Sequence, residues 1–199
     1  DQSGGRGASK GDGIVTELDF RILDFIREHF SSGPMDAAMK FFTFLGEAGW
    51  FWILIGIVLA AIPKTRRTGV TVLAALLLSL IVCNVTIKPL VGRIRPYDLR
   101  EGIELMIAGP TDFSFPSGHA SASFAAAAAI FAYHKKWGAG ALALAAVIAF
   151  SRLYLYVHYP SDVLAGSLLG ILFGVISYYI VKTVFERIGK KRGSKNAKP

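Results

Sequence analysis

Five long runs of apolar residues constrain the fold of this chain more than any other feature of its sequence. Over its 199 residues, 53% are hydrophobic and 18% are charged, which is too apolar for an ordinary soluble domain. Runs of this kind are typical of helices that cross a bilayer. The sequence therefore predicts an all-α fold, a polytopic membrane helical bundle. Its five expected transmembrane helices are residues 48–62, 70–87, 119–133, 139–150 and 163–184.

The region before the first run has a different character. Residues 1–13 are rich in Gly and polar residues, and we interpret them as a flexible leader. From residue 15 to 30, apolar residues recur at helical spacing opposite a charged face, which is typical of a helix lying at the membrane interface. A second helical piece is expected over residues 35–45. Whether residues 15–46 span the membrane is left open, and an N-terminus on the inner side requires a sixth transmembrane helix there.

Basic residues cluster in the short loops 63–68 and 134–137 and in a tail at 190–199. The positive-inside rule puts these segments, including the C-terminus, in the cytoplasm. Counting crossings then places residues 151–162 on the outer face, together with a polar loop of roughly thirty residues after the second run. The sequence thus predicts one multi-pass cell-membrane domain over residues 14–189. Topology and anionic lipid headgroups account for the net charge of +8, so nucleic acid is not an expected partner.

Small residues indicate close packing between two of the expected helices. Gly166, Gly170 and Gly174 recur every four residues and give one helix a flat face. The Ala-rich run 125–129 offers a partner surface. Glycine and alanine are also simply common in membrane helices, which is the alternative interpretation.

Two cations stand at the outer end of the second run. Lys88 and Arg95 are seven residues apart and share one face if the chain stays helical, although Pro89 and Gly92 make a kink expected. Taken alone, the pair is also explained by cations reaching from a membrane interface. Against that explanation, positive charge is not favoured by topology on the outer face.

A second cluster, Ser117, Gly118 and His119, directly precedes a helix. Ser117 suits an N-cap, and Gly118 lets backbone N–H groups approach an anion at the positive end of the helix dipole. In isolation, ordinary helix capping explains this cluster equally well.

The third cluster contains Arg152, His158 and Asp162. The planar guanidinium of Arg152 matches phosphate oxygens. Asp162 lies four residues after His158 and can accept a hydrogen bond from one imidazole nitrogen, leaving the other as a nucleophile or base. A structural His–Asp pair at a helix start is the alternative.

The conjunction of the three clusters favours chemistry. Three cations, an N–H cradle and two histidines are all placed on the outer face by an argument that used only charge and crossing count. Such a set suits phosphoryl transfer, in which negative charge on the phosphoryl oxygens must be stabilised.

These residues resemble the complete three-part signature of the type 2 phosphatidic acid phosphatase (PAP2) family, with its spacing intact. Among its members, the chain resembles the bacterial phosphatidylglycerophosphate phosphatase B and undecaprenyl-diphosphate phosphatase group. The matching residues lie between positions 88 and 162: Lys88, Arg95-Pro96, Pro116-Ser117-Gly118-His119, Ser151-Arg152, His158 and Asp162.

The resemblance implies a role for each residue. His158 would attack phosphorus and become a phosphohistidine, Asp162 would orient it, and His119 would protonate the leaving group and later activate water. The phosphoryl oxygens would be held by the remaining residues: Lys88, Arg95, Ser117, Gly118 and Arg152. No metal and no cofactor is expected, and the outer-face acids show no recognised metal-ligand spacing: Asp98, Glu101, Glu104 and Asp112.

The function implied is hydrolysis of a lipid phosphate on the extracytoplasmic face, with phosphatidylglycerophosphate, phosphatidic acid and undecaprenyl diphosphate as candidate substrates. The expected partners are this substrate and membrane lipids, and the oligomeric state is left open. Two alternatives remain at this point: a vanadium-dependent haloperoxidase-like enzyme, and a lipid or anion binder or transporter without catalysis. Halide oxidation would favour the first, and binding without turnover the second.

Overall fold

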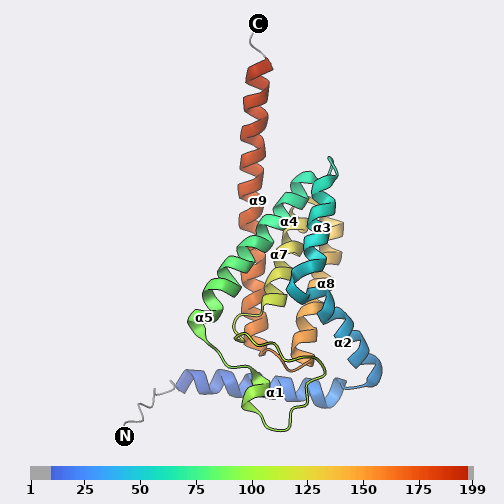
Figure 1. Ribbon diagram of the computed structural model, residues 1–199, viewed down its shortest axis with the longest axis vertical. Coiled ribbons are helices and arrows are strands. Elements are labelled where there is room, and N and C mark those ends of the chain that lie inside the picture. The colour runs from blue at the N-terminus through green and yellow to red at the C-terminus, as the bar shows by residue number, and fades with distance from the viewer. Residues whose placement is uncertain (1–9, 197–199) are drawn as a thin grey trace.

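The computed structural model describes residues 10–196, and every regular element within them is a helix. The prediction of an all-α fold is confirmed. Figure 1 shows a bundle of long helices with α1 lying across its lower end. The longer helices are α1 (Lys10–Phe30), α2 (Gly33–Gly46), α3 (Trp50–Ala61), α4 (Arg66–Ser79), α7 (Gly118–Tyr133), α8 (Lys135–Tyr154) and α9 (Pro160–Asn196).

Helix α1 is the amphipathic helix expected over residues 15–30. Leu23 on its inner side is fully buried, whereas Phe25 is 53% exposed. The helix begins earlier than expected, because residues 10–13 of the expected leader form its first turn. The remainder of that leader, residues 1–9, lies outside the described residues.

Four segments among the described residues are long and apolar enough to cross a membrane. Two adjacent helices, α2 and α3, count as one of them, and α7 has only 16 residues, which is short for a spanning helix. The expected count of five or six spans is therefore not confirmed, and the residues before Gly46 do not form a separate sixth candidate. The four segments are Gly33–Ala61, Arg66–Leu99, Lys135–Tyr154 and Pro160–Lys190.

The chain after α4 departs from a regular helix. A π-helix, η2 (Leu80–Ile87), leads into the short α5 (Lys88–Val91), which ends at Gly92 with a φ of 61°. A further short helix, α6 (Pro96–Leu99), follows with Arg95 extended before it. The kink expected from Pro89 and Gly92 is therefore present, and Lys88 and Arg95 do not lie on the face of one continuous helix. Gly92 has a left-handed backbone conformation that a residue with a Cβ rarely adopts, and the turn it makes brings Lys88 and Arg95 together.

The close packing predicted for the glycine face of α9 is confirmed. Helix α7 lies at the centre of the bundle against α4, α8 and α9. A Cβ atom at Gly170 would lie 2.3 Å from the Ser121 carbonyl oxygen, and one at Gly174 would lie 2.7 Å from Ala128 Cβ. Only glycine allows the two backbones to approach so closely, and this contact fixes the N-termini of α7 and α9 side by side.

Candidate active site

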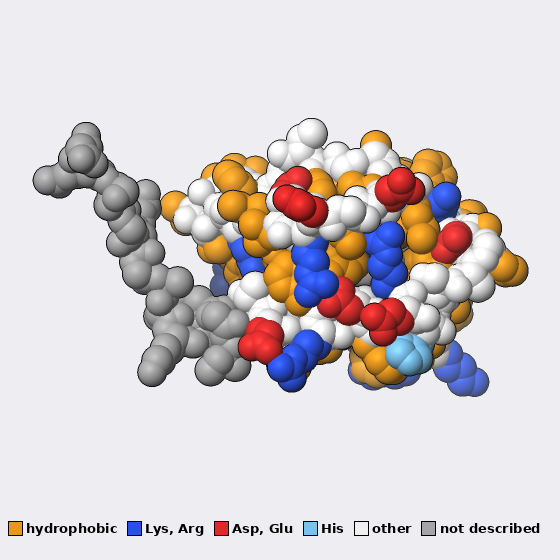
Figure 2. Space-filling model, turned by 90° about the horizontal axis from the view of Figure 1, so that it is seen from below, with side chains coloured by type: hydrophobic (Ala, Val, Ile, Leu, Met, Phe, Trp, Pro, Cys, Tyr) orange, Lys and Arg blue, Asp and Glu red, His pale blue; other side chains and the backbone are white. Residues whose placement is uncertain are grey.

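The predicted site residues gather at the end of the bundle that α1 crosses. A cavity of about 510 Å³ opens there, between α3, α4, α7 and the turn joining α8 to α9. Seen from that end, Lys and Arg side chains lie among Asp and Glu side chains on the face of the molecule (Figure 2). The cavity is lined by six of the predicted site residues: Lys88, Arg95, Gly118, His119, Arg152 and His158.

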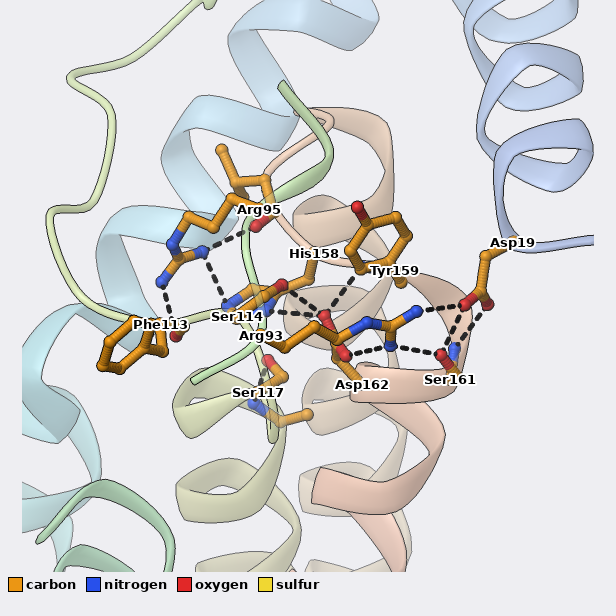
Figure 3. Close-up of polar contacts among 12 residues, drawn as sticks. Asp19, Arg93, Arg95, Phe113, Ser114, Ser117, His158, Tyr159, Ser161 and Asp162 are labelled. Atoms are coloured by element: carbon orange, nitrogen blue, oxygen red, sulfur yellow. Dashed lines mark hydrogen bonds and ion pairs between the residues drawn. The ribbon is translucent and has the colours of Figure 1, made fainter. Parts of the chain in front are cut away.

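His158 sits in the turn between α8 and α9 and is 1% exposed. Its Nδ1 lies 3.5 Å from Asp162 Oδ2, and its Nε2 lies 3.2 Å from Arg95 Nη1 (Figure 3). We assign the proton to Nδ1, because Nε2 faces a guanidinium donor. Burial lowers the pKa of His158, and the nearby charges of Arg95 and Arg152 lower it further against the opposing effect of Asp162. The neutral ring therefore presents a lone pair at Nε2.

Asp162 is fully buried behind His158, in the first turn of α9. Its Oδ1 accepts a hydrogen bond from Arg93 Nη1 at 2.5 Å. Its Oδ2 accepts hydrogen bonds from the hydroxyl of Ser114 and from the backbone N–H of Tyr159. These donors hold the carboxylate in one orientation and compensate for its burial.

Arg93, which was not among the residues predicted from the sequence, links this carboxylate to α1. Arg93 Nη2 donates to Asp19 Oδ2 at 2.8 Å, and Asp19 also accepts hydrogen bonds from the backbone N–H and the hydroxyl of Ser161 (Figure 3). The only signal in the sequence is a second arginine two residues before Arg95. Its partners lie about seventy residues away on either side, so spacing alone does not reveal them.

The three predicted cations are almost completely buried, with Lys88 5%, Arg95 3% and Arg152 2% exposed. Arg95 is fixed by hydrogen bonds to three carbonyl oxygens, those of Val157 at 2.6 Å, Asp112 at 2.7 Å and Phe113 at 3.4 Å. Arg152 donates to the hydroxyl of Thr43 on α2, and its Nε has no partner among the described residues. Buried cations with unused donors make this cavity a site for an anion.

Asp112, from the long loop, forms ion pairs with two of these cations. Its carboxylate pairs with Lys88 and, at 2.6 Å, with Arg95 Nη2. Burial alone would raise the pKa of Asp112, but the hydrogen bonds and charges of Lys88 and Arg95 outweigh it and lower the pKa to about 2. An ionised carboxylate thus pairs with Lys88 and Arg95 at the cavity.

Ser117 and His119 have different positions relative to the cavity. Ser117 is buried, and its hydroxyl accepts from the backbone N–H of Ala120 as the N-cap of α7. The structure therefore uses the Ser117 side chain as a cap and does not place it among the residues that line the cavity. His119 lines the cavity, with Nε2 3.7 Å from Glu47 Oε2.

The cavity continues from its polar end into an apolar part. Ile53 of α3 and Leu73 and Leu77 of α4 line it, and Leu77 is 57% exposed on the outer surface of the bundle. The cavity thus joins the cations and histidines to the side of the molecule that apolar residues cover. An amphiphile with an anionic head and an apolar tail matches both parts.

Metal ligation has no obvious candidate in the described part of the chain, where no group of three or more His, Cys, Asp or Glu residues is arranged to hold an ion. The chemistry that the described side chains offer is a neutral imidazole that faces a carboxylate 3.5 Å away, a second imidazole, and three cations around one cavity. That set can attack an electrophile, exchange a proton and stabilise developing negative charge.

Comparison with known proteins gives consistent matches. A family model described as the PAP2 superfamily matches residues 68–186. The undecaprenyl-diphosphatase of Sulfolobus acidocaldarius is 31% identical over 180 residues, which cover 89% of this chain and 83% of that protein. The structure of Aquifex aeolicus LpxE superposes with a TM-score of 0.71 at 26% identity, covering 80% of this chain and 94% of the other. The PAP2-type phosphatidylglycerolphosphate phosphatase of Bacillus subtilis superposes with a TM-score of 0.66 at 26% identity, covering 88% of each chain.

Proposed function

The chain belongs to the PAP2 superfamily and is a membrane lipid phosphatase, and from this premise we propose that it releases the terminal phosphate of an isoprenoid lipid diphosphate through a phosphohistidine at His158. The observation that carries the proposal is the pair formed by His158 and Asp162. Nδ1 faces the carboxylate, and Nε2 faces Arg95 at the cavity. A histidine so oriented is prepared for attack at Nε2.

The proposed reaction has two steps. The lone pair of His158 Nε2 attacks phosphorus, the bond from phosphorus to the leaving oxygen breaks, and His119 gives a proton to that oxygen. Water then attacks the phosphohistidine, His119 takes a proton from the water, the phosphorus–nitrogen bond breaks, and inorganic phosphate leaves. Asp162 supports the positive charge that the His158 ring carries between the steps.

The buried cations have the second role in the proposal. Lys88, Arg95 and Arg152 stabilise the charge on the phosphoryl oxygens, and the N-terminus of α7 at Gly118 adds backbone N–H groups. Substrate phosphate replaces the carboxylate of Asp112 at Lys88 and Arg95. Binding therefore exchanges one anion for another, which spares the cations from being buried without a partner.

The substrate class is proposed from the cavity together with the relatives. The apolar part of the cavity suits a hydrocarbon tail beside the phosphate. The relative from Sulfolobus acidocaldarius is named an undecaprenyl-diphosphatase, and the Bacillus subtilis structure is titled a phosphatidylglycerolphosphate phosphatase. We place undecaprenyl diphosphate first and phosphatidylglycerophosphate and phosphatidic acid after it.

The extracytoplasmic location of the site is also a proposal. The basic turn between α3 and α4 and the C-terminal end of α9 lie at the end of the bundle opposite α1 (Figure 1). The positive-inside rule favours the cytoplasm for that end. The cavity, at the other end, then faces the outer headgroup region.

The proposal is tested by phosphate release from a panel of lipid mono- and diphosphates by the purified protein in detergent. His158→Ala should lose more than about a thousandfold in kcat, because no other group replaces the nucleophile. Acid-labile, base-stable radiolabel on the wild-type protein during turnover should identify the phosphohistidine.

Two outcomes contradict the proposal. One is full activity in a folded His158→Ala variant. The other is binding of lipid phosphate by the wild type without release of phosphate from any lipid tested. A chelator should leave the rate unchanged, and inhibition by chelator would require a metal that the proposed reaction does not use.

A further inference from the structure

The turn between α2 and α3 brings a carboxylate to the cavity from outside the region that the family model matches. This turn, η1 (Glu47–Gly49), has left-handed backbone conformations at Ala48, with a φ of 48°, and at Gly49, with a φ of 69°. A residue with a Cβ rarely adopts positive φ, so its surroundings must hold Ala48 in place. All three residues line the cavity, and all lie before residue 68, where the family match begins.

The turn packs against His119. Glu47 Oε2 lies 3.7 Å from His119 Nε2, which is buried and has no hydrogen-bond partner within residues 10–196. Gly46 contacts the same ring so closely that a Cβ there would lie 2.6 Å from His119 Cδ2. The turn therefore follows one edge of the imidazole and places a carboxylate next to its unpartnered nitrogen.

Hydrogen bonds on both sides keep the turn in position. Trp50 Nε1 donates to the carbonyl oxygen of Phe44 at 2.9 Å, which closes the turn on itself. Trp52 is 1% exposed, and its Nε1 donates at 2.9 Å to the hydroxyl of Ser123, one turn after His119 on α7. The start of α3 is thus tied to the helix that carries His119, and Glu47 is held close to the ring.

We propose that Glu47 is a positioning residue for His119, an inference that rests on the proposed function. The carboxylate accepts a hydrogen bond from Nε2–H when substrate fills the cavity, since hydrogen bonds that are long in an empty site tighten in the reacting complex. It holds the ring in one tautomer, so that Nδ1 exchanges the proton with the leaving oxygen and then with water. A carboxylate beside an imidazole also stabilises the protonated ring.

Each of the two histidines would then pair with one carboxylate, but through opposite ring nitrogens. Asp162 faces Nδ1 of His158 at 3.5 Å and leaves Nε2 to attack phosphorus. Glu47 holds Nε2 of His119 and leaves Nδ1 to transfer the proton. Protonation matters most when the leaving group is a poor one, because a strongly basic oxygen cannot depart without a proton. Glu47 should therefore matter more for an alkoxide leaving group than for a phosphate leaving group.

The test compares Glu47→Gln with the wild type on two substrates. Phosphatidic acid releases an alkoxide, whereas farnesyl diphosphate releases a phosphate ester anion. We expect the variant to lose about thirtyfold in kcat on phosphatidic acid and less than about threefold on farnesyl diphosphate, with KM nearly unchanged on both. Glu47→Asp should recover part of the loss. Glu101→Gln, which changes an exposed carboxylate in the long loop, is the matched control and should resemble the wild type.

Three results would overturn the inference: equal losses on the two substrates, a change confined to KM, or no loss at all. A lower KM with unchanged kcat would mean that Glu47 only repels the substrate. Failure of the inference differs from failure of the proposed function. If His158→Ala and His119→Ala are inactive while Glu47→Gln behaves like the wild type, the proposed function stands and Glu47 has no part in it.

Discussion

Asp162 is a fully buried carboxylate that the chain supplies with donors from three separate segments. Arg93 reaches it from the turn after α5, Ser114 from the long loop, and the backbone N–H of Tyr159 from the residue just before α9. Leaving one partner of a buried ion pair alone costs more than the pair itself contributes. Substitution of Arg93 should therefore disturb Asp162, and with it His158, more than substitution of either other donor.

We expect Arg93→Gln to lower kcat by about tenfold or more, because Asp162 then lacks its charged partner and orients His158 less well. KM should change little, since Arg93 is not among the residues that line the cavity at His158. Steady-state phosphate release checks both parameters. Arg100→Gln removes another arginine that pairs with α1, through Asp24, and serves as the control. Similar losses in both variants would mean that Arg93 acts only by anchoring α1.

Asp112 is expected to compete with phosphate for Lys88 and Arg95. Asp112→Asn should therefore lower the inhibition constant of inorganic phosphate by about tenfold, which corresponds to about 1.4 kcal/mol. Because the pKa of Asp112 is lowered to about 2, the carboxylate is ionised at every pH well above that value. The ratio between the inhibition constants of the wild type and of Asp112→Asn should thus stay constant between about pH 5 and about pH 8.

Inhibition of lipid hydrolysis by added phosphate, measured across this pH range, checks the prediction. Asp98→Asn removes an exposed carboxylate of α6 and controls for net charge. A higher inhibition constant in Asp112→Asn would show instead that Asp112 helps to hold phosphate.

Among the elements, α7 and α9 form the contact that sets the geometry of the site. Ser117 N, at the start of α7, donates to the carbonyl oxygen of Asp162 at 3.1 Å, at the start of α9. Farther along, Gly166, Gly170 and Gly174 keep the two helices at backbone contact. Separation of the helices would move His119 away from His158, because each histidine depends on the start of one of them.

Gly170→Ala should destabilise the protein, because the added methyl group would meet the Ser121 carbonyl 2.3 Å away. Overpacking of this kind costs about 1–3 kcal/mol, so we expect Tm in detergent to fall by about 5 °C. Gly140→Ala, on α8, adds the same group where nothing lies within 4 Å and should leave Tm unchanged or slightly higher. Equal effects from the two substitutions would argue against a tight interface between α7 and α9.

At the scale of the whole molecule, the polar part and the apolar part of the cavity lie at different positions along the bundle. The buried cations and both histidines lie at the end crossed by α1, and the cavity extends from them between α3 and α4 towards exposed leucines. A lipid can thus keep its tail against the side of the bundle while its phosphate contacts the site. In the proposed function, this arrangement lets a buried site receive a substrate that is held in a membrane.

Much of the site could be predicted from the sequence, because its chemically distinctive residues stand in short local patterns. His119 follows its own helix cap, and His158 and Asp162 are four residues apart, so local geometry brings each group into place. Arg93, Asp112 and Glu47 were missed as site residues for the opposite reason. Each acts through a contact between segments distant in sequence, and a lone charged residue in a loop gives no sign of its partner.

The sequence by itself determined that the chain forms apolar helices, where these helices begin to within a few residues, and which reactive groups the chain carries. These properties depend on hydrophobic periodicity and on neighbours within one or two turns. Only the tertiary structure decided that α2 and α3 are separated by the left-handed turn η1, that Gly92 turns Arg95 back towards Lys88, and that Asp112 pairs with both of these cations. It also placed α1, through Asp19 and Arg93, behind the carboxylate of Asp162. Such contacts arise from the packing of whole helices, because a side chain's partner depends on where every intervening element lies.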